Sequence, residues 1–349
     1  MRRIFGIIYN CNPMATILPK KLAHGSNINL FHTSSPVEKR DVAAFKKVLA
    51  RLKQKYPNTK LYDVAQTELD PRYLAASANE RMRKFRQAKK EANWLLPVYG
   101  GTGCSDLVRR IAKQDLQGIF RKRPIVSGFS DNTHLLNYLY FKLRLVTFHY
   151  TNAVGLFHDK NWRLFFDIIS GRKNMFSFYS AKYHWITKKA PQHPISGIAV
   201  GGNLTVFRNF VDMFSIKPYS WEPYILFLED FDLDAEDFHG TISALAQHGV
   251  FDRARALVIG EFAEKEHQSY FKKLDKIFTQ RKKKGPLLYI EYLLSDIISK
   301  REKENDPLYI LKIDNLGHHV KKDSFIIPIG GHTKIYPDKK IEFTGPFVE

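Results

Sequence analysis

Short apolar runs alternate with amphipathic helical patterns through the first half of the chain. The predicted strands are the runs at residues 28–31, 60–64, 94–99, 125–126 and 146–149. A helix is predicted from Asp41 to about Tyr56, where apolar residues recur at helical spacing. Residues 78–93 have a charged helical pattern, which predicts a mostly solvated face whose Arg and Lys residues need no ligand. This alternation favours a layered α/β domain with a mostly parallel sheet.

The pattern changes after residue 194. The predicted strands of the second half are residues 198–204, 224–230, 256–260 and 339–343, with a strand-rich end from residue 311. A helical pattern with Ile242 and Leu245 lies between two of these strands, so the second half is predicted to mix α and β structure. Residues 156–194 are rich in Lys, Arg, His and aromatics and are interpreted as a connection.

Composition adds limits on the class of protein. With 349 residues and 44% apolar residues, the chain is long enough for two domains with packed cores. Its two cysteines, Cys11 and Cys104, exclude a disulfide framework and form no metal-type pair, so no metal or cofactor is expected. The formal net charge of +20 attracts polyanions, but no known nucleic-acid reader motif accompanies it. We therefore do not expect a nucleic-acid partner.

The N-terminus begins like a signal sequence but does not continue as one. The apolar part of residues 1–9 is short, is broken by Asn10, and has no small-residue cleavage site nearby. We interpret residues 1–27 as an extension. No apolar run approaches the roughly 20 residues that a membrane helix needs, so a soluble, cytoplasmic protein is expected.

The stretch at residues 124–133 carries the first candidate for chemistry. The apolar run at 125–126 leads through Gly128 to Ser130, and a helical pattern follows, which predicts strand, sharp turn and helix. A serine there lies near a helix N-terminus, where its Oγ can act as a nucleophile and the N–H of Asp131 can hold an oxyanion. The G-x-S-x-G elbow is incomplete, because Asn132 replaces the second glycine. The alternative is an ordinary helix start capped by Ser130 or Asp131.

A second turn, Gly100–Gly103, also lies between a predicted strand and a predicted helix. Its glycines allow backbone N–H groups close to a ligand, although neither a dinucleotide fingerprint nor a Walker lysine is present. A tight turn without a ligand is the alternative. Cys104 and Ser105 are rival nucleophiles, ranked below Ser130 because each is expected to begin the helix.

Acids and bases occur at later strand ends. The strand at 224–230 ends in Glu229 and Asp230, and histidines stand beside a glycine at residues 317–319. His149, at a strand end, is another candidate base, although such a histidine is more often structural. The order serine, glutamate, histidine supplies the parts of an acyl-transfer triad.

The ordered set of short motifs resembles the LD-carboxypeptidases, a serine-peptidase family that includes the microcin C self-immunity peptidases. The matching segments are Gly100–Gly103, Gly128–Thr133, Gly201–Leu204, Leu228–Asp230, Gly317–His318 and Ile327–Gly330. The resemblance implies Ser130 as nucleophile, Glu229 as orienting acid and His318, rather than His319 or His332, as base. It also implies oxyanion N–H groups from Asp131 and the glycine turn, at Gly101.

The same resemblance implies the domain organisation. An α/β domain at residues 28–155 would carry the nucleophile, and a largely β C-terminal domain at residues 195–349 would carry the glutamate and histidine, after the connection at 156–194. The site would lie at the domain interface, in a homodimer. Departures from the family pattern bear on the identity of the substrate. Tyr99 and Thr102 replace an arginine and a tyrosine of the family's glycine turn. After the acidic strand, Phe238–Thr241 stands where the family usually has an arginine that begins a helix.

The function implied is hydrolysis of an L,D-amide bond, releasing the terminal D-alanine of peptidoglycan tetrapeptides in cell-wall recycling. The substrate would be a small peptide or muropeptide. One alternative is an immunity-like hydrolase of peptidyl-nucleotide amides. Another, from a different class, is a basic polyanion-binding protein with a disused site.

Overall fold

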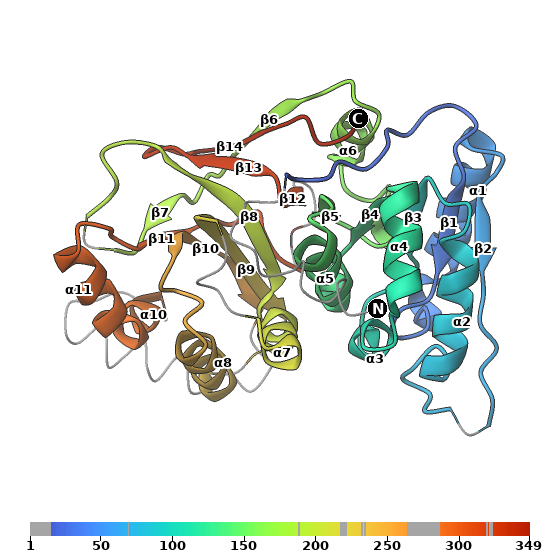
Figure 1. Ribbon diagram of the computed structural model, residues 1–349, viewed down its shortest axis with the longest axis horizontal. Helices are drawn as coiled ribbons and strands as arrows, with labels where there is room; N and C mark the ends of the chain where they lie inside the picture. The colour runs from blue at the N-terminus through green and yellow to red at the C-terminus, as the bar shows by residue number, and fades with distance from the viewer. Residues whose placement is uncertain are drawn as a thin grey trace, which may run out of the picture.

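Two sheets, which meet in the middle of the molecule, organise the fold (Figure 1). The computed structural model describes residues 15–68, 70–187, 189–216, 222–231, 233, 235–263, 287–318, 320 and 324–349. The two-domain α/β class predicted from the sequence is confirmed.

The first sheet has the strand order β12-β5-β4-β3-β1-β2. Its strands are β1 (Ile28–Phe31), β2 (Lys60–Tyr62), β3 (Trp94–Pro97), β4 (Ile125–Gly128), β5 (Thr147–His149) and β12 (Ile327–Ile329). The first five strands are parallel, and β12 pairs antiparallel with β5. The helices of this part are α1 (Val42–Lys55), α2 (Ala78–Ala88), α3 (Cys104–Val108), α4 (Lys113–Lys122), α5 (Thr133–Leu143) and α6 (Trp162–Ile169).

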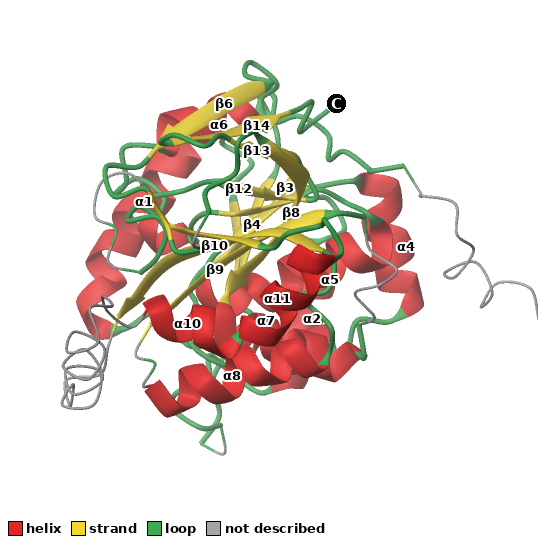
Figure 2. Ribbon diagram, turned by 90° about the vertical axis from the view of Figure 1, so that its left-hand side faces the viewer, coloured by secondary structure: helices red, strands yellow, loops and turns green. Residues whose placement is uncertain are grey.

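The second sheet has the order β6-β14-β13-β8-β9-β10-β11-β7. Its strands are β6 (Met175–Tyr179), β7 (His184–Trp185), β8 (Ile195–Asn203), β9 (Tyr224–Phe231), β10 (Ala254–Ala263), β11 (Tyr309–Lys312), β13 (His332–Ile335) and β14 (Lys340–Thr344). Strands β8 to β11 are parallel, and the outer strands are antiparallel to their neighbours. Helices α7 (Leu204–Phe214), α8 (Ala235–Gln247), α10 (Leu287–Leu293) and α11 (Ser295–Lys303) cover one face (Figure 2).

Two segments connect regions that the sequence pattern separates. Residues 156–194, expected as a connection, contain α6, β6 and β7, and the two strands belong to the second sheet. Strand β12 lies late in the chain yet forms the edge of the first sheet. The chain then turns at Gly330, whose φ of +88° and close approach to Tyr140 both require glycine.

The parallel strands determine where side chains gather. The segment after β4 of the first sheet lies against the end of β8 of the second, where the Asn203 N–H donates to Thr133 Oγ1. Ligands of such sheets bind beyond the carboxyl ends of the strands. The turns after β3 and β4 therefore face the acids at the end of β9.

The described N-terminal segment packs along the first sheet. Residues 15–27 run beside the first sheet, where Ile17 bonds to Arg144 and Val146 through the backbone.

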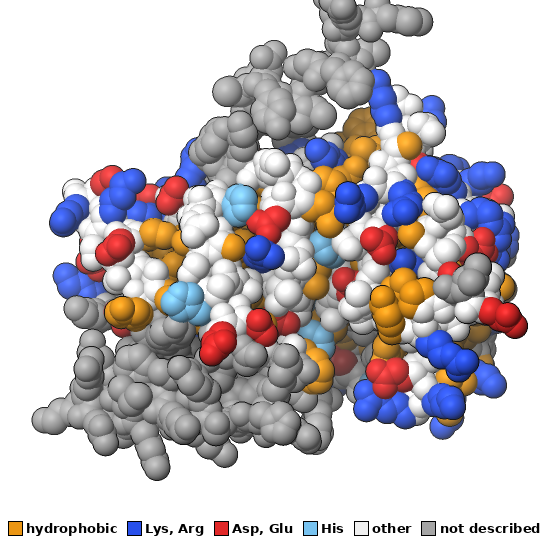
Figure 3. All heavy atoms as spheres, turned by 90° about the horizontal axis from the view of Figure 1, so that it is seen from below, with side chains coloured by type: hydrophobic (Ala, Val, Ile, Leu, Met, Phe, Trp, Pro, Cys, Tyr) orange, Lys and Arg blue, Asp and Glu red, His pale blue; other side chains and the backbone are white. Residues whose placement is uncertain are grey.

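Within the described residues, no helix is both long and apolar enough to cross a membrane. Seen from below, Lys and Arg side chains are interspersed with Asp and Glu, not gathered in one continuous field (Figure 3). The basic run at residues 280–284 lies outside the described part of the chain.

Candidate active site

Ser130 lies on a sharp turn between β4 and α5, as the sequence pattern predicted. Phe129 is still extended, whereas Ser130 has a φ of +60°, which is uncommon and strained for a residue with a side chain. Asn152 holds the turn by accepting hydrogen bonds from the Phe129 N–H and the Asn132 amide, each 2.9 Å long. Neither Ser130 nor Asp131 caps the helix with its side chain, so the ordinary helix start does not describe this stretch.

His318 and Glu229 complete a hydrogen-bonded series with this serine. The Nε2 atom of His318 is 3.0 Å from Ser130 Oγ, and its Nδ1 atom is 2.6 Å from Glu229 Oε2. Because an ionised glutamate only accepts, Nδ1–H donates to Glu229, and Nε2 is left to accept the Ser130 hydroxyl proton. The three residues come from the turn after β4, the end of β9 and the loop after β11.

Burial and charge act in opposite directions on this series. Glu229 is fully buried, and desolvation raises its pKa, an effect that the neighbouring His318 reduces. For His318, burial favours the neutral ring, but the negative charge of Glu229 and the hydrogen bond to it outweigh burial, so its pKa is raised. Glu229 therefore favours the imidazolium that forms when His318 takes a proton.

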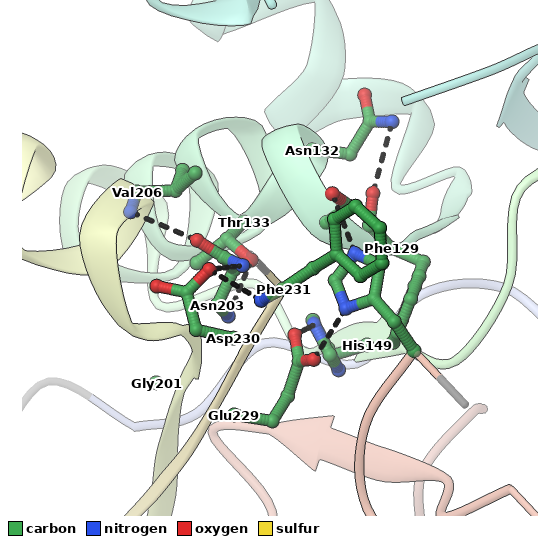
Figure 4. Close-up of polar contacts among 12 residues, drawn as sticks. Phe129, Asn132, Thr133, His149, Gly201, Asn203, Val206, Glu229, Asp230 and Phe231 are labelled. Atoms are coloured by element: carbon green, nitrogen blue, oxygen red, sulfur yellow. Dashed lines mark hydrogen bonds and ion pairs between the residues drawn. The ribbon is translucent and has the colours of Figure 1, made fainter. Parts of the chain in front are cut away.

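Two aromatic rings enclose His318. The ring of Phe129 lies 4.6 Å from the imidazole centroid, and that of Phe231 stacks at 5.3 Å (Figure 4). Phe231 is half exposed and lies at the outer side of the site. The two rings restrict how the imidazole can turn and shield it from water.

The glycine turn after β3 lies directly against Ser130. A Cβ added at Gly100 would lie 3.2 Å from Ser130 Cβ, and Gly101 has a φ of +93°. The turn is fixed by Ser35, which accepts from the Thr102 N–H and donates its own N–H to the Gly100 carbonyl. This brings bare backbone beside the serine hydroxyl.

The Asp131 side chain points away from the hydroxyl and ties two loops together. Its carboxylate accepts hydrogen bonds from Ser34 Oγ, at 2.6 Å, and from the Cys104 N–H, at 2.8 Å. Burial raises its pKa to about 6. The neighbouring Asp230 also has a structural role, because it accepts from Asn203 and Thr205 at the start of α7.

The other candidates have different positions. Cys104 and Ser105 begin α3, as expected, and burial raises the pKa of the fully buried Cys104 thiol. His332 is exposed on β13. His319 lies outside the described residues. In the described part of the chain, no group of His, Cys, Asp or Glu could hold a metal ion.

Arg81 is an exception to the mostly solvated face that the charged pattern of residues 78–93 predicts. Arg81 was expected on a solvated helix face, but its side chain is fully buried. It donates hydrogen bonds to the carbonyls of Thr33, Ala76 and Gly103, the last at 2.6 Å. The helical spacing of Arg81 with the buried Phe85 and Ala88 is the signal that was available.

Known proteins resemble this chain over most of its length. The model of the LD-carboxypeptidase N-terminal domain matches residues 28–150, and that of the LD-carboxypeptidase C-terminal domain matches residues 196–335. A putative carboxypeptidase of Vibrio cholerae is 25% identical over 268 residues, which cover 69% of this chain and 78% of that protein. The microcin C7 self-immunity protein MccF of Escherichia coli is 22% identical over 279 residues, covering 70% and 78%.

Solved structures show the same fold. Wild-type MccF without ligand matches with a TM-score of 0.69 at 18% identity, over 95% of this chain and 100% of that one. The muramoyltetrapeptide carboxypeptidase from Oxalobacter formigenes matches with a TM-score of 0.64 at 19% identity, over 92% and 99%. Since the two family models together cover most of the chain, the protein belongs to the LD-carboxypeptidase family.

Proposed function

We propose that the protein is a serine carboxypeptidase in which Ser130 is the nucleophile, His318 the general base and Glu229 the orienting acid. The observation that carries this proposal is the pair of hydrogen bonds, 3.0 Å and 2.6 Å, that link the three side chains. A serine held at positive φ, a histidine and a buried acid are the arrangement that acyl transfer uses on several unrelated folds.

The reaction follows from this geometry. As Ser130 Oγ attacks the amide carbonyl carbon, His318 Nε2 takes the hydroxyl proton, and the N–H groups of Gly101 and Asp131 stabilise the oxyanion. His318 then gives that proton to the leaving amine as the C–N bond breaks. Water attacks the resulting ester, passes a proton to His318, and releases the acid as Ser130 regains its proton. Glu229 remains ionised and holds the tautomer throughout.

The substrate that we propose is a peptidoglycan tetrapeptide that loses its terminal D-alanine at an L,D-bond. Family membership and the shared fold with a muramoyltetrapeptide carboxypeptidase support this choice. We further propose that the protein acts as a cytoplasmic homodimer in peptidoglycan recycling, as the family resemblance implies.

A second candidate substrate is a peptidyl-nucleotide amide. Its support is that MccF, which shares the fold, has been solved with aspartyl sulfamoyl adenosine and with glutamyl sulfamoyl guanosine. The altered glycine turn, with Tyr99 and Thr102, borders Ser130 and could favour either substrate.

The test is parallel incubation with a muropeptide tetrapeptide and an aminoacyl sulfamoyl nucleoside, with products identified by mass. Loss of D-alanine from the first supports the carboxypeptidase, and cleavage of only the second supports the immunity-like hydrolase.

Ser130→Ala should reduce turnover by about 10⁴-fold or more without loss of fold, because triad deletions have effects of that order. If Ser130→Ala remains active while Cys104→Ala or Ser105→Ala is inactive, the nucleophile is wrong. Salt-dependent binding of a polyanion without any turnover would favour the alternative of a basic polyanion-binding protein with a disused catalytic site.

A further inference from the structure

Only one oxygen of the Glu229 carboxylate has a hydrogen-bond partner among the described residues. Oε2 accepts from His318, whereas Oε1 is buried and unpaired. A buried carboxylate oxygen without a donor is costly, and such atoms are uncommon in folded proteins. The unpaired oxygen therefore marks a position where a donor is to be expected.

His149 is the side chain that faces this oxygen. Its Nε2 atom lies 4.0 Å from Glu229 Oε1, and both side chains are fully buried (Figure 4). Within the part of the chain that the structure describes, neither ring nitrogen of His149 has a hydrogen-bond partner on another residue. Two unpaired buried groups thus face each other across a gap that is about 1 Å longer than a hydrogen bond.

The fold holds His149 at this place from several sides. It ends β5, where it pairs with Gly128 of β4 and with Ile327 of β12, and its ring lies 5.0 Å from that of Phe129. Gly202 leaves the space for the ring, because a Cβ there would lie 2.8 Å from His149 Cδ2. With a φ of +130°, Gly202 also has a backbone conformation that few other residues adopt.

The environment keeps His149 neutral. Burial, together with the nearby His318, lowers its pKa to about 3. The other charged groups around Glu229 are His318, Asp230 and Glu261, and the two acids raise the pKa of Glu229 further. A neutral imidazole can donate one N–H to the carboxylate without placing a second positive charge beside His318.

We propose that His149 is a positioning residue that donates Nε2–H to Glu229 Oε1 when the site is at work. This rests on the proposed function, in which Glu229 orients His318. With one donor on each oxygen, the carboxylate cannot rotate away from His318 Nδ1. The remaining 4.0 Å gap closes with a small shift, and hydrogen bonds in catalytic sites are often longer before substrate binds.

The test compares His149→Phe, which keeps a ring but removes both nitrogens, with His149→Gln, which keeps an N–H donor. The readout is the rate at which a fluorophosphonate labels Ser130 across pH 5 to 9, because it does not depend on the identity of the substrate. We expect His149→Phe to slow labelling by about 10- to 100-fold, as losses of supporting hydrogen bonds at reactive sites do. Its acid-side midpoint should rise, because a carboxylate without that donor holds the proton on His318 more tightly.

His149→Gln should recover most of the rate and return the midpoint toward that of the unmodified protein. A packing role predicts the reverse order, with the ring of His149→Phe tolerated and His149→Gln the slower variant. That order, or equal rates in all three proteins, overturns the proposal. His134→Phe is the matched control, since His134 is also a buried histidine but lies on α5.

A measurement on the unmodified protein remains decisive if His149→Phe fails to fold. Nitrogen-15 NMR of labelled histidines, assigned with His149→Gln, reports which ring nitrogen of His149 carries the proton. We expect the Nε2–H tautomer at neutral pH, and the Nδ1–H tautomer would contradict the donation. If the unmodified protein is not labelled at all, the proposed function fails. If it is labelled but the variants match it, only the role of His149 fails.

Discussion

Ser130 is held in its strained conformation by neighbours, not by its own preference. A non-glycine residue at positive φ persists where surrounding contacts over-determine it. Here Asn152 fixes the preceding residue, and the Asp131 carboxylate is tied to Ser34 and Cys104. The Ser130 hydroxyl is therefore held in place by a network that includes the buried carboxylate of Asp131. The raised pKa of this carboxylate makes its contribution to stability depend on pH.

The variant Asp131→Asn tests how this buried carboxylate affects stability. The pKa of Asp131 is raised from 3.8 to about 6, so the folded state binds its proton more tightly than the unfolded state. The contribution of Asp131 to the free energy of unfolding is thus favourable at low pH, where its carboxyl is protonated. That contribution is lost as pH rises from about 4 to 6. Asparagine keeps an acceptor for Ser34 and Cys104 without a charge. We expect the variant to gain up to about 3 kcal/mol relative to the unmodified protein by pH 7, from two pKa units.

Thermal melting from pH 4 to pH 7 measures that difference. Buried histidines such as His134, with its pKa lowered to about 4, act with the opposite sign in this range. They are present in both proteins, so they cancel in the comparison. A difference between variant and unmodified protein that does not change with pH would refute the assignment.

The pH dependence of turnover gives a second prediction for single residues. In the proposed mechanism His318 must be neutral to accept the serine proton. Burial lowers the pKa of His318, but the charge of Glu229 and the hydrogen bond to it outweigh burial, so this pKa is raised above the ordinary 6.5. We expect kcat/KM to fall on the acid side with a midpoint above 6.5. Glu229→Gln removes the charge that raises the pKa, so its midpoint should move down while kcat falls by about 10³- to 10⁴-fold. A profile that is flat from pH 5 to 8 would contradict a histidine base.

At the scale of elements, α2 supports the glycine turn from behind. Arg81 projects from this helix into the space between the loops after β1 and β3, where it donates to Thr33 and Gly103. Its Nη2 atom is also 3.5 Å from Asp106 Oδ2. The guanidinium donates to the carbonyls of Thr33 and Ala76, and it shares the Gly103 carbonyl with the N–H of Asp106. We therefore assign Arg81 a structural role in shaping the turn beside Ser130.

Arg81→Met should be destabilising, because it leaves buried carbonyls without donors while keeping an apolar stem. We expect a loss of about 2 to 5 kcal/mol in the free energy of urea unfolding, at about 1 to 3 kcal/mol for each unsatisfied group. Arg83→Met is the control, since Arg83 is exposed and pairs with Glu80 on the same helix. If both variants unfold at the same urea concentration, Arg81 does not hold the turn.

Elements with a local signal could be predicted from the sequence. The apolar runs ending in glycine or acid became β3, β4 and β9, and the helix expected from Asp41 to Tyr56 spans Val42–Lys55. The candidate residues Ser130, Glu229 and His318 lie at the ends of such elements, so their neighbourhood followed from strand polarity and the family motifs. The helix expected at 78–93 ends at Ala88.

Features that depend on distant partners could not be predicted. The φ of Ser130 depends on Asn152, 22 residues later in the chain. The role of β12 depends on β5, almost 180 residues earlier, and its short apolar run gives no indication of the sheet that it joins. The contact of His149 with Glu229 also needs both sheets, because β5 and β9 belong to different ones.

At the scale of the molecule, the two sheets are tied together by bonds that surround the site. Strand β12 pairs with β5 of the first sheet, and the chain directly after it bonds to Ala199 of β8 in the second. The side chain of Asn137, on α5, binds both the N–H and the C=O of Gly201. The Asn203 N–H donates to Thr133 Oγ1. Serine and glutamate therefore come from different sheets, but the structure between them is continuous.

This continuity predicts that the two sheets unfold as one unit. Native-state hydrogen exchange in low denaturant should give the slowest amides of β4 and of β9 the same free energy of opening, because neither sheet can open without breaking the bonds at β12 and α5. Val126 and Leu226, both fully buried in these strands, are suitable probes. If the second sheet were an independent unit, Leu226 would exchange through an opening of lower free energy and weaker denaturant dependence than Val126. In that case Ser130 would lose its base in partial openings, and fluorophosphonate labelling would fall at denaturant concentrations where β4 remains protected. Equal free energies, with labelling lost only on global unfolding, would mean that the junction of the sheets holds the site together as firmly as either core.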